Sequence, residues 1–98
     1  MIEISPAELR QRLARKDRIF LLDVRQPDEF AAGHIEGAVL IPLGELPQRV
    51  GELRKDDDIV VNCKAGGRSA KAVAFLEAQG FKKVANLTGG FLRWQAEG

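Results

Sequence analysis

One stretch of this sequence decides the fold, namely Asp58-Ile59-Val60-Val61-Asn62-Cys63-Lys64-Ala65-Gly66-Gly67-Arg68-Ser69. Its first residues are mostly β-branched and apolar, which predicts a buried strand from Asp58 to Asn62. A short loop follows that begins with the only cysteine, and the alanine-rich segment from Ser69 to Gln79 predicts a helix. A strand, a glycine-containing loop and a helix N-terminus together form a cradle of backbone N–H groups that favours anions. Cys63 lies at the mouth of this predicted cradle, where a thiolate would be stabilised.

The segments around this stretch alternate between predicted strands and predicted helices. Further strands are expected at 2–4, 19–24, 38–41 and 84–87, and the two in the middle should be buried. Further helices are expected after Ser5, from 26 to 33 and from 46 to 53. The helix from 69 to 79 is apolar nearly all round, so we expect it to be buried on more than one side. This alternation predicts an α/β fold with a mostly parallel central sheet, whose sites form at the carboxyl ends of the strands.

The composition restricts the partners and cofactors of the chain. Its 98 residues suit a single domain, 1–98, and fifteen basic against fourteen acidic side chains leave a formal net charge of +1. This balance favours neither nucleic acid nor a membrane as a partner. One cysteine and one histidine exclude an internal disulfide and a Cys/His metal cluster. We therefore expect a cofactor-free monomer or weak dimer, and a cytoplasmic location because Met1-Ile2-Glu3-Ile4-Ser5-Pro6 lacks the features of a secretion signal.

The residues after Cys63 suit a nucleophilic thiolate. The helix that begins near Arg68 directs its positive end at the sulfur, while Gly66 and Gly67 allow successive N–H groups to turn inward. Lys64 and Arg68 add positive charge. A lone buried cysteine is more often an inert core residue, but core packing does not require a Gly-Gly-Arg loop directly after it. We therefore favour the nucleophile.

The spacing between cysteine and arginine distinguishes two families that use this type of loop. Cysteine-based phosphatases place five residues between them, whereas this loop has four, namely Lys64, Ala65, Gly66 and Gly67. The shorter loop resembles that of rhodanese-type sulfurtransferases, whose pattern Cys-x-x-Gly-x-Arg-Ser is present as Cys63, Gly66, Arg68 and Ser69. Its smaller ring of amides fits one terminal sulfur of a persulfide better than the oxygens of a phosphate.

Two further stretches strengthen the resemblance to rhodaneses. Asp23-Val24-Arg25, followed by Glu29-Phe30 and Gly33-His34-Ile35-x-Gly37-Ala38, resembles the first signature of the family. Leu87-x-Gly89-Gly90 with Trp94 resembles its last signature. The resemblance spans about residues 2–94 and implies a five-stranded parallel sheet flanked by helices.

The resemblance also implies an activity. The Cys63 thiolate would take the outer sulfur of a donor such as thiosulfate, and the persulfide would pass it to cyanide, a thiol or a thioredoxin-like protein. The loop from Lys64 to Ser69 would bind the substrate through its amides. Lys64 would attract an anionic donor, by analogy thiosulfate rather than mercaptopyruvate, and Arg68 would hold the loop in shape as well as contact the substrate.

Residues outside the loop are expected to support the site. We expect structural support from Asp23 and Arg25, with a chemical role for Asp23 left open because it lies at the carboxyl end of its strand. An ion pair between Arg25 and Glu29 is expected to attach the short helix to the strand end. Trp94 is expected to pack in the core. His34 lies in a predicted tight connection, which disfavours a cysteine–histidine pair of the papain kind.

Two other functions stay open on the sequence alone. A rhodanese-like domain could bind partner proteins without turnover, although catalytically inactive members generally lack the cysteine. A phosphatase or arsenate reductase would use similar loop chemistry, but this loop is one residue short for a tetrahedral oxyanion. No second cysteine is present to resolve an intermediate within the chain.

Overall fold

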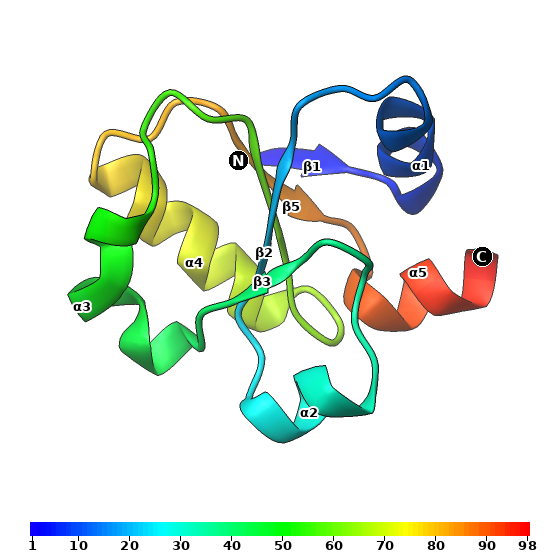
Figure 1. Cartoon of the computed structure of the whole chain (residues 1–98). Helices are drawn as coiled ribbons and strands as arrows, with labels where there is room; N and C mark the ends of the chain where they lie inside the picture. Colours follow the sequence, from blue (N-terminus) through cyan, green and yellow to red (C-terminus); the bar gives the residue numbers. More distant parts are fainter.

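Five strands lie side by side in one parallel sheet at the centre of the molecule (Figure 1). The structure, a computed structural model, describes residues 1–98. The order of the strands in the sheet is β1-β5-β4-β2-β3, and every neighbouring pair is parallel. The strands are β1 (Ile2–Ile4), β2 (Phe20–Asp23), β3 (Val39–Leu40), β4 (Ile59–Asn62) and β5 (Val84–Leu87). This confirms the predicted α/β class and the five-stranded parallel sheet.

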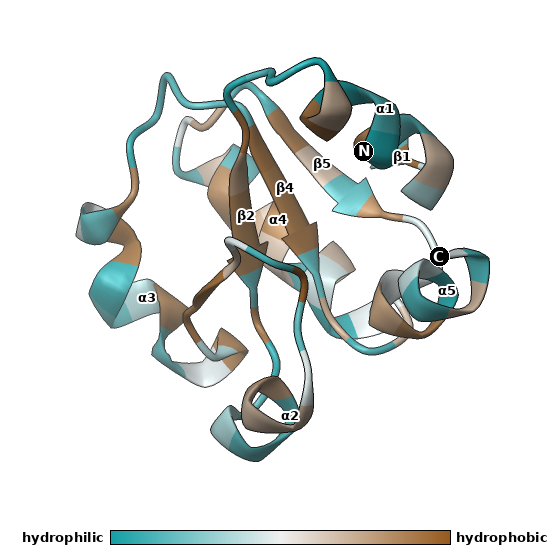
Figure 2. Ribbon diagram, turned by 45° about the vertical axis from the view of Figure 1, so that its right-hand side comes forward, coloured by the Kyte–Doolittle hydropathy of each residue, from teal (hydrophilic) through white to brown (hydrophobic).

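Helices cover both faces of this sheet. They are α1 (Pro6–Ala14), α2 (Pro27–Ala32), α3 (Leu46–Arg49), α4 (Gly67–Ala78) and α5 (Gly90–Glu97). α3 and α4 pack on one face and α1 and α5 on the other, while α2 lies beyond the carboxyl end of β2 (Figures 1 and 2). Because both faces are covered, the central strands can be apolar throughout.

β4 is the middle strand, and all four of its residues are buried. Ile59 and Val61 pack with α3 and α4, whereas Val60 packs with α1 and α5. This alternation follows from the two-residue repeat of a strand, and β2 and β4 appear as hydrophobic bands in Figure 2. Cys63, which directly follows β4, belongs to the cluster on the α4 side.

Two segments near α3 differ from the prediction. The stretch 38–41 forms only a two-residue edge strand in which Val39 is 44% exposed, because β3 pairs with β2 alone. The helix predicted from 46 to 53 is divided into α3 and a following 3₁₀ turn at Val50–Glu52. A preceding 3₁₀ turn spans Leu43–Glu45. Gly51 lies inside the predicted helix, where its low helix propensity favours the break.

The predicted burial of α4 on more than one side is wrong. Its buried residues lie on one side, and Ala74 and Ala78 on the other are exposed. Alanine favours a helix in solvent as well as in a core, so the alanines of this segment indicate helix propensity rather than burial. The helix also begins two residues earlier than predicted, at Gly67.

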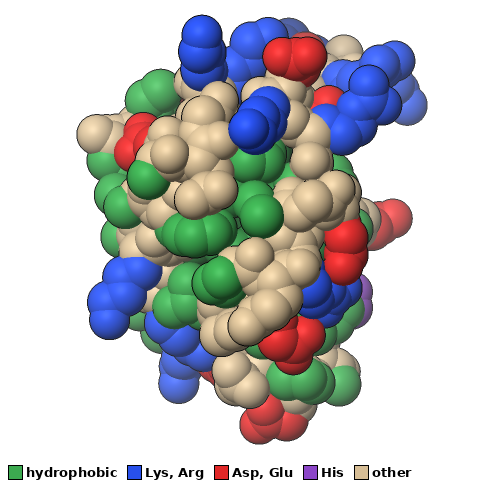
Figure 3. Space-filling view, turned by 90° about the vertical axis from the view of Figure 1, so that its left-hand side faces the viewer, with side chains coloured by type: hydrophobic (Ala, Val, Ile, Leu, Met, Phe, Trp, Pro, Cys, Tyr) green, Lys and Arg blue, Asp and Glu red, His purple; other side chains and the backbone are tan.

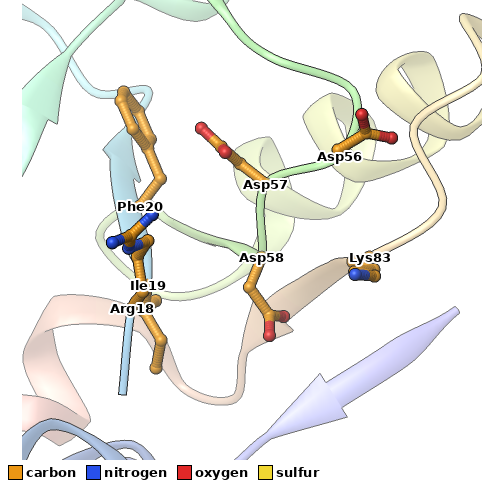
Figure 4. A pocket seen from close by; sticks show the side chains of 7 residues that line it. All are labelled: Arg18, Ile19, Phe20, Asp56, Asp57, Asp58 and Lys83. Carbon is orange, nitrogen blue, oxygen red and sulfur yellow. The ribbon is translucent and has the colours of Figure 1, made fainter. Parts of the chain in front are cut away.

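Away from Cys63, the surface has a hydrophobic patch on one face (Figure 3) and a pocket at one end of the sheet. On the face formed by α3 and α4, hydrophobic side chains gather near the centre, and charged side chains of both signs surround them (Figure 3). At the amino ends of β2 and β4, a pocket of about 340 Å³ lies between Phe20, Asp57 and Lys83 (Figure 4). This pocket is at the opposite end of the strands from Cys63.

None of the helices has the length and apolar character needed to cross a membrane.

Candidate active site

Cys63 lies beneath a loop that joins the middle strand of the sheet to α4. The loop begins directly after β4 and ends where α4 begins, at Gly67. Only 1% of Cys63 is exposed, whereas Lys64 and Ala65 beside it are exposed. The cysteine is therefore at the floor of the cradle, and its predicted place at the mouth is wrong.

Polar groups of the loop and of α4 surround the sulfur. The Gly66 N–H donates to Cys63 Sγ over 3.0 Å, and Ser69 Oγ lies 3.3 Å from the same atom. Gly66 has a φ of 113°, which residues with a side chain adopt only with strain. The glycine therefore allows the turn that directs its amide inward.

Burial of Cys63 by itself raises the pKa of its thiol. Hydrogen bonds from the Ser69 hydroxyl and from the amides of Ser69, Gly66 and Ala65 outweigh burial, so the pKa of Cys63 falls below its ordinary value. The amides belong to the loop and to the first turn of α4, where backbone N–H groups have no partner within the helix. A lowered pKa increases the fraction of thiolate at neutral pH, and the thiolate is the nucleophilic form.

Arg68 is joined to Glu29 of α2 in a two-bond ion pair. Arg68 Nη1 and Nη2 lie 2.7 and 2.9 Å from the Glu29 oxygens Oε1 and Oε2. The Gln26 N–H also donates to Glu29 Oε1, over 3.0 Å. The predicted pair between Arg25 and Glu29 is therefore wrong. Glu29 instead offsets the charge of Arg68 and connects α2 to the start of α4.

Arg25 is paired with Asp23, and both side chains are almost fully buried. Arg25 Nε lies 3.0 Å from Asp23 Oδ1, and Nη2 lies 2.8 Å from Oδ2. Arg25 Nη2 also donates to the carbonyl oxygen of Gly33 over 2.8 Å, and the guanidinium lies over the Phe91 ring, 4.5 Å from its centre. This cluster joins β2, the end of α2 and α5, and neither side chain forms a hydrogen bond with Cys63.

The start of α5 lies directly against the backbone of the candidate nucleophile. The Phe91 N–H donates to Cys63 O over 2.8 Å, and the Leu92 N–H donates to Lys64 O over 3.0 Å. A Cβ at Gly90 would come within 2.5 Å of Lys64 O and 2.6 Å of Cys63 O, and Gly90 has a φ of 62°. Both the close approach and the left-handed backbone therefore require glycine at this position.

Comparison with known proteins identifies one family over nearly the whole chain. The sequence profile of the rhodanese-like domain matches residues 5–97. The chain belongs to the rhodanese-like domain family.

Named relatives of this rhodanese-like domain include sulfurtransferases. The sulfurtransferase of Allochromatium vinosum is 42% identical, over 98% of this chain and 90% of its own length. The thiosulfate sulfurtransferase GlpE of Ectopseudomonas mendocina is 34% identical, over 95% of this chain and 84% of its own length. A rhodanese-related protein from Thermoplasma volcanium has a crystal structure that matches with a TM-score of 0.92 and 34% identity, over 100% of this chain and 94% of that one.

The rhodanese-like domain also contains two residues near the site that the sequence analysis does not single out. Asn86 of β5 is buried, and its Oδ1 contacts Ser69 Oγ. Glu3 of β1 accepts a hydrogen bond from Asn86 Nδ2 over 3.2 Å. A polar side chain inside an apolar strand usually has a buried partner, and this signal could have pointed to Asn86. Glu3 is 83 positions away from Asn86 in the chain, so no local pattern connects them.

The ion pair of Glu29 should make the stability of the domain depend on pH in the acid range. Hydrogen bonds from Arg68 and from the Gln26 amide lower the pKa of Glu29 from 4.5 to about 2. A carboxylate with a lower pKa in the folded state stabilises the fold above its unfolded pKa, and this contribution disappears as the pH falls from 4.5 towards 2. Because the Glu29 side chain is 25% exposed, we expect Glu29→Gln to lower the free energy of unfolding at pH 7 by only about 1–2 kcal/mol.

Urea unfolding at a series of pH values measures this effect. The difference between the native sequence and Glu29→Gln should shrink as the solution is acidified through the range between the two pKa values. Glu77→Gln, which removes an exposed carboxylate from α4, is the matched control and should change little. Parallel curves for the native sequence and Glu29→Gln down to the acid end would show that the pair does not stabilise the fold.

Proposed function

We propose that this rhodanese-like domain is a thiosulfate-type sulfurtransferase that carries the transferred sulfur on Cys63. The proposal rests mainly on the environment of Cys63 Sγ, which lies 3.0 Å from the Gly66 N–H and has a lowered pKa because loop amides and Ser69 donate to it. The relative named thiosulfate sulfurtransferase, which aligns with nearly the whole chain, supports the same class of donor.

The first half-reaction moves one sulfur atom from the donor to the protein. The Cys63 thiolate attacks the outer sulfur of thiosulfate, a new S–S bond forms, and the S–S bond of the donor breaks. Sulfite leaves with the bonding electron pair, so no proton has to be transferred. This agrees with the position of the only histidine, His34, whose Nδ1 lies 2.8 Å from the Phe30 carbonyl oxygen instead of near the sulfur.

The second half-reaction returns the protein to the thiolate. Cyanide, or the thiolate of an acceptor, attacks the outer sulfur of the persulfide, and Cys63 leaves with the electron pair of the S–S bond. A thiol of lower pKa leaves faster, so the hydrogen bonds that activate Cys63 as a nucleophile also improve it as a leaving group. The loop amides stabilise negative charge in both halves of the cycle.

Intact-mass measurement tests this chemistry directly. Incubation with thiosulfate should add one sulfur atom per chain, and cyanide should remove it with formation of an equal amount of thiocyanate. Mercaptopyruvate and an aryl phosphate serve as comparison substrates. No adduct with any sulfur donor, together with tight binding of a partner protein, would favour a binding module. Rapid hydrolysis of the aryl phosphate that depends on Cys63 would contradict the argument from loop size.

Lys64 should contribute to binding of the anionic donor. It is exposed beside Cys63 and makes no ion pair, whereas the charge of Arg68 is offset by Glu29. We expect Lys64→Gln to raise KM for thiosulfate about two- to fivefold at low ionic strength with little change in kcat, because a single exposed charge attracts an anion weakly.

Steady-state kinetics at two salt concentrations measure the effect of Lys64. High salt should remove the difference, because it screens exposed charges. Lys71→Gln, on the exposed side of α4, is the matched control for the loss of one positive charge. If both variants show the same KM and the same salt dependence, Lys64 has no special part in donor binding.

A further inference from the structure

Ser69 has one hydroxyl proton and three acceptors within reach. Its Oγ lies 2.5 Å from Asn86 Oδ1, 3.2 Å from Gly66 O and 3.3 Å from Cys63 Sγ. The two oxygens can only accept a hydrogen bond, as can a thiolate. Since the hydroxyl donates fully to one acceptor at a time, Asn86 and the sulfur of Cys63 compete for the same proton.

The amide of Asn86 is oriented by the groups on its other side. Asn86 Nδ2 lies 3.2 Å from Glu3 Oε2 and 3.4 Å from Gly66 O. If the amide were reversed, Oδ1 would lie against a carboxylate and a carbonyl oxygen, neither of which can donate to it. Glu3 is itself held by the Thr88 hydroxyl, which donates to its Oε1 over 2.9 Å. The oxygen of Asn86 must therefore face Ser69.

We propose that Asn86, oriented by Glu3, is a positioning residue that competes with Cys63 for the Ser69 proton and so weakens the hydrogen bond that Ser69 gives to the thiolate. When the hydroxyl donates to Asn86, its lone pairs face the sulfur and favour the protonated thiol. When it turns to the sulfur, the thiolate gains a hydrogen bond and Asn86 loses one. The side chains of β1 and β5 thus oppose the loop amides, which favour the thiolate.

Burial makes this competition effective. Ser69 is 0% exposed and Asn86 is 5% exposed, so water has little access to satisfy either group in place of the other. In such surroundings a hydrogen bond to a charged atom is stronger than one to a neutral atom. Removing Asn86 leaves the Gly66 carbonyl oxygen as the one neutral competitor in place of two, so the Ser69 bond should shift towards the charged Cys63 thiolate.

The other charged groups that face this part of the protein are either paired or exposed. Arg68 pairs with Glu29 and Asp23 pairs with Arg25, whereas Lys64 is exposed. Glu3 makes no ion pair, and the hydrogen bonds that connect its carboxylate to the sulfur pass through Asn86 and Ser69. An effect of Glu3 on the thiol that travels through this chain must therefore vanish when Ser69 is removed.

Alkylation of Cys63 by iodoacetamide over a range of pH measures the pKa of its thiol without any sulfur donor. Asn86→Leu, a residue of similar size that cannot accept, should lower the pKa of Cys63 by about one unit. Ser69→Ala should raise it, because the thiolate loses a donor. Glu3→Gln should lower the pKa of Cys63 by less than Asn86→Leu, because the Asn86 amide can then reverse.

Double variants decide whether the effect passes through Ser69. In the Ser69→Ala background, neither Asn86→Leu nor Glu3→Gln should shift the pKa of Cys63 any further. A shift that persists without Ser69, or an absent or upward shift in the single variants, would overturn the proposal. Should Asn86→Leu fail to fold, Glu3→Gln at the exposed surface decides by the same comparison, with Glu77→Gln as the control for charge loss.

The inference builds on Cys63 as the nucleophile of the proposed function, but the two fail separately. Alkylation reports the thiol whether or not sulfur is transferred. The expected pKa shifts without any persulfide would contradict the proposed sulfur transfer and support the role of Asn86. Persulfide formation without the expected pKa shifts would support the proposed sulfur transfer and contradict the role of Asn86.

Discussion

Cys63→Ser should abolish both the sulfur adduct and the thiocyanate production of this domain. A serine hydroxyl can accept hydrogen bonds from the loop amides, but it is scarcely ionised at neutral pH and cannot form a persulfide. We expect turnover with thiosulfate and cyanide to fall by at least about a thousandfold, to the level of the uncatalysed reaction. Since the native chain has one cysteine, the mass gain is assigned to Cys63 without peptide mapping.

A control for folding is needed because Cys63 is buried. Serine is close to cysteine in size, so thermal unfolding and the circular dichroism spectrum of Cys63→Ser should remain near those of the native chain. Lys71→Gln, on the exposed side of α4, serves as the active control in the same assay. A folded Cys63→Ser variant with full turnover would show that the mechanism proposed for Cys63 is wrong.

Gly90→Ala should lower the free energy of unfolding by about 3 kcal/mol or more. The new Cβ would lie within 2.6 Å of the carbonyl oxygens of Cys63 and Lys64, and alanine is strained at a φ of 62°. The backbone atoms that it meets cannot rotate away as a side chain could. Relief of the clash must move α5 away from the loop and lengthen the bonds from the Phe91 and Leu92 amides. We therefore expect slower persulfide formation as well as lower stability, measured by mass and by urea unfolding.

Gly44→Ala is the matched control for this substitution. A Cβ at Gly44 meets nothing within 4 Å, and the backbone there is not left-handed. Its effect on the free energy of unfolding should stay within about 1 kcal/mol in either direction. Equal effects of the two substitutions would mean that the close approach at Gly90 does not hold the loop.

The strands and the loop could be predicted because their signals are local. An apolar run such as 59–61 between polar residues indicates a buried strand whichever neighbours it has, and the cysteine loop is contiguous in the sequence. Burial of α4 and of β3 could not be predicted in the same way. Whether Ala74 or Val39 meets solvent depends on which elements pack beside it, and the amino-acid type alone does not determine that.

The ion pairs show why part of the candidate site could not be predicted. Arg25 is close in sequence to both Asp23 and Glu29, and spacing alone does not distinguish between these partners. In the structure Asp23, the last residue of β2, pairs with Arg25 two positions later, and Glu29 pairs with Arg68, which is 39 positions away. The sequence shows which side chains carry opposite charges, but the pairing of Glu29 with Arg68 depends on how α2 lies against α4.

The sequence by itself determined the parallel α/β fold and the loop that begins at Cys63, because hydrophobic periodicity and a contiguous loop are local properties, and its motifs indicated the family through their resemblance to rhodaneses. Only the tertiary structure decided that Cys63 lies at the floor of this loop, that Gly90 supports it from α5, and that Asn86 competes for the Ser69 proton. Each of these depends on groups far apart in the chain meeting within hydrogen-bond or van der Waals distance. Which groups meet is set by the order of the strands and the packing of the helices.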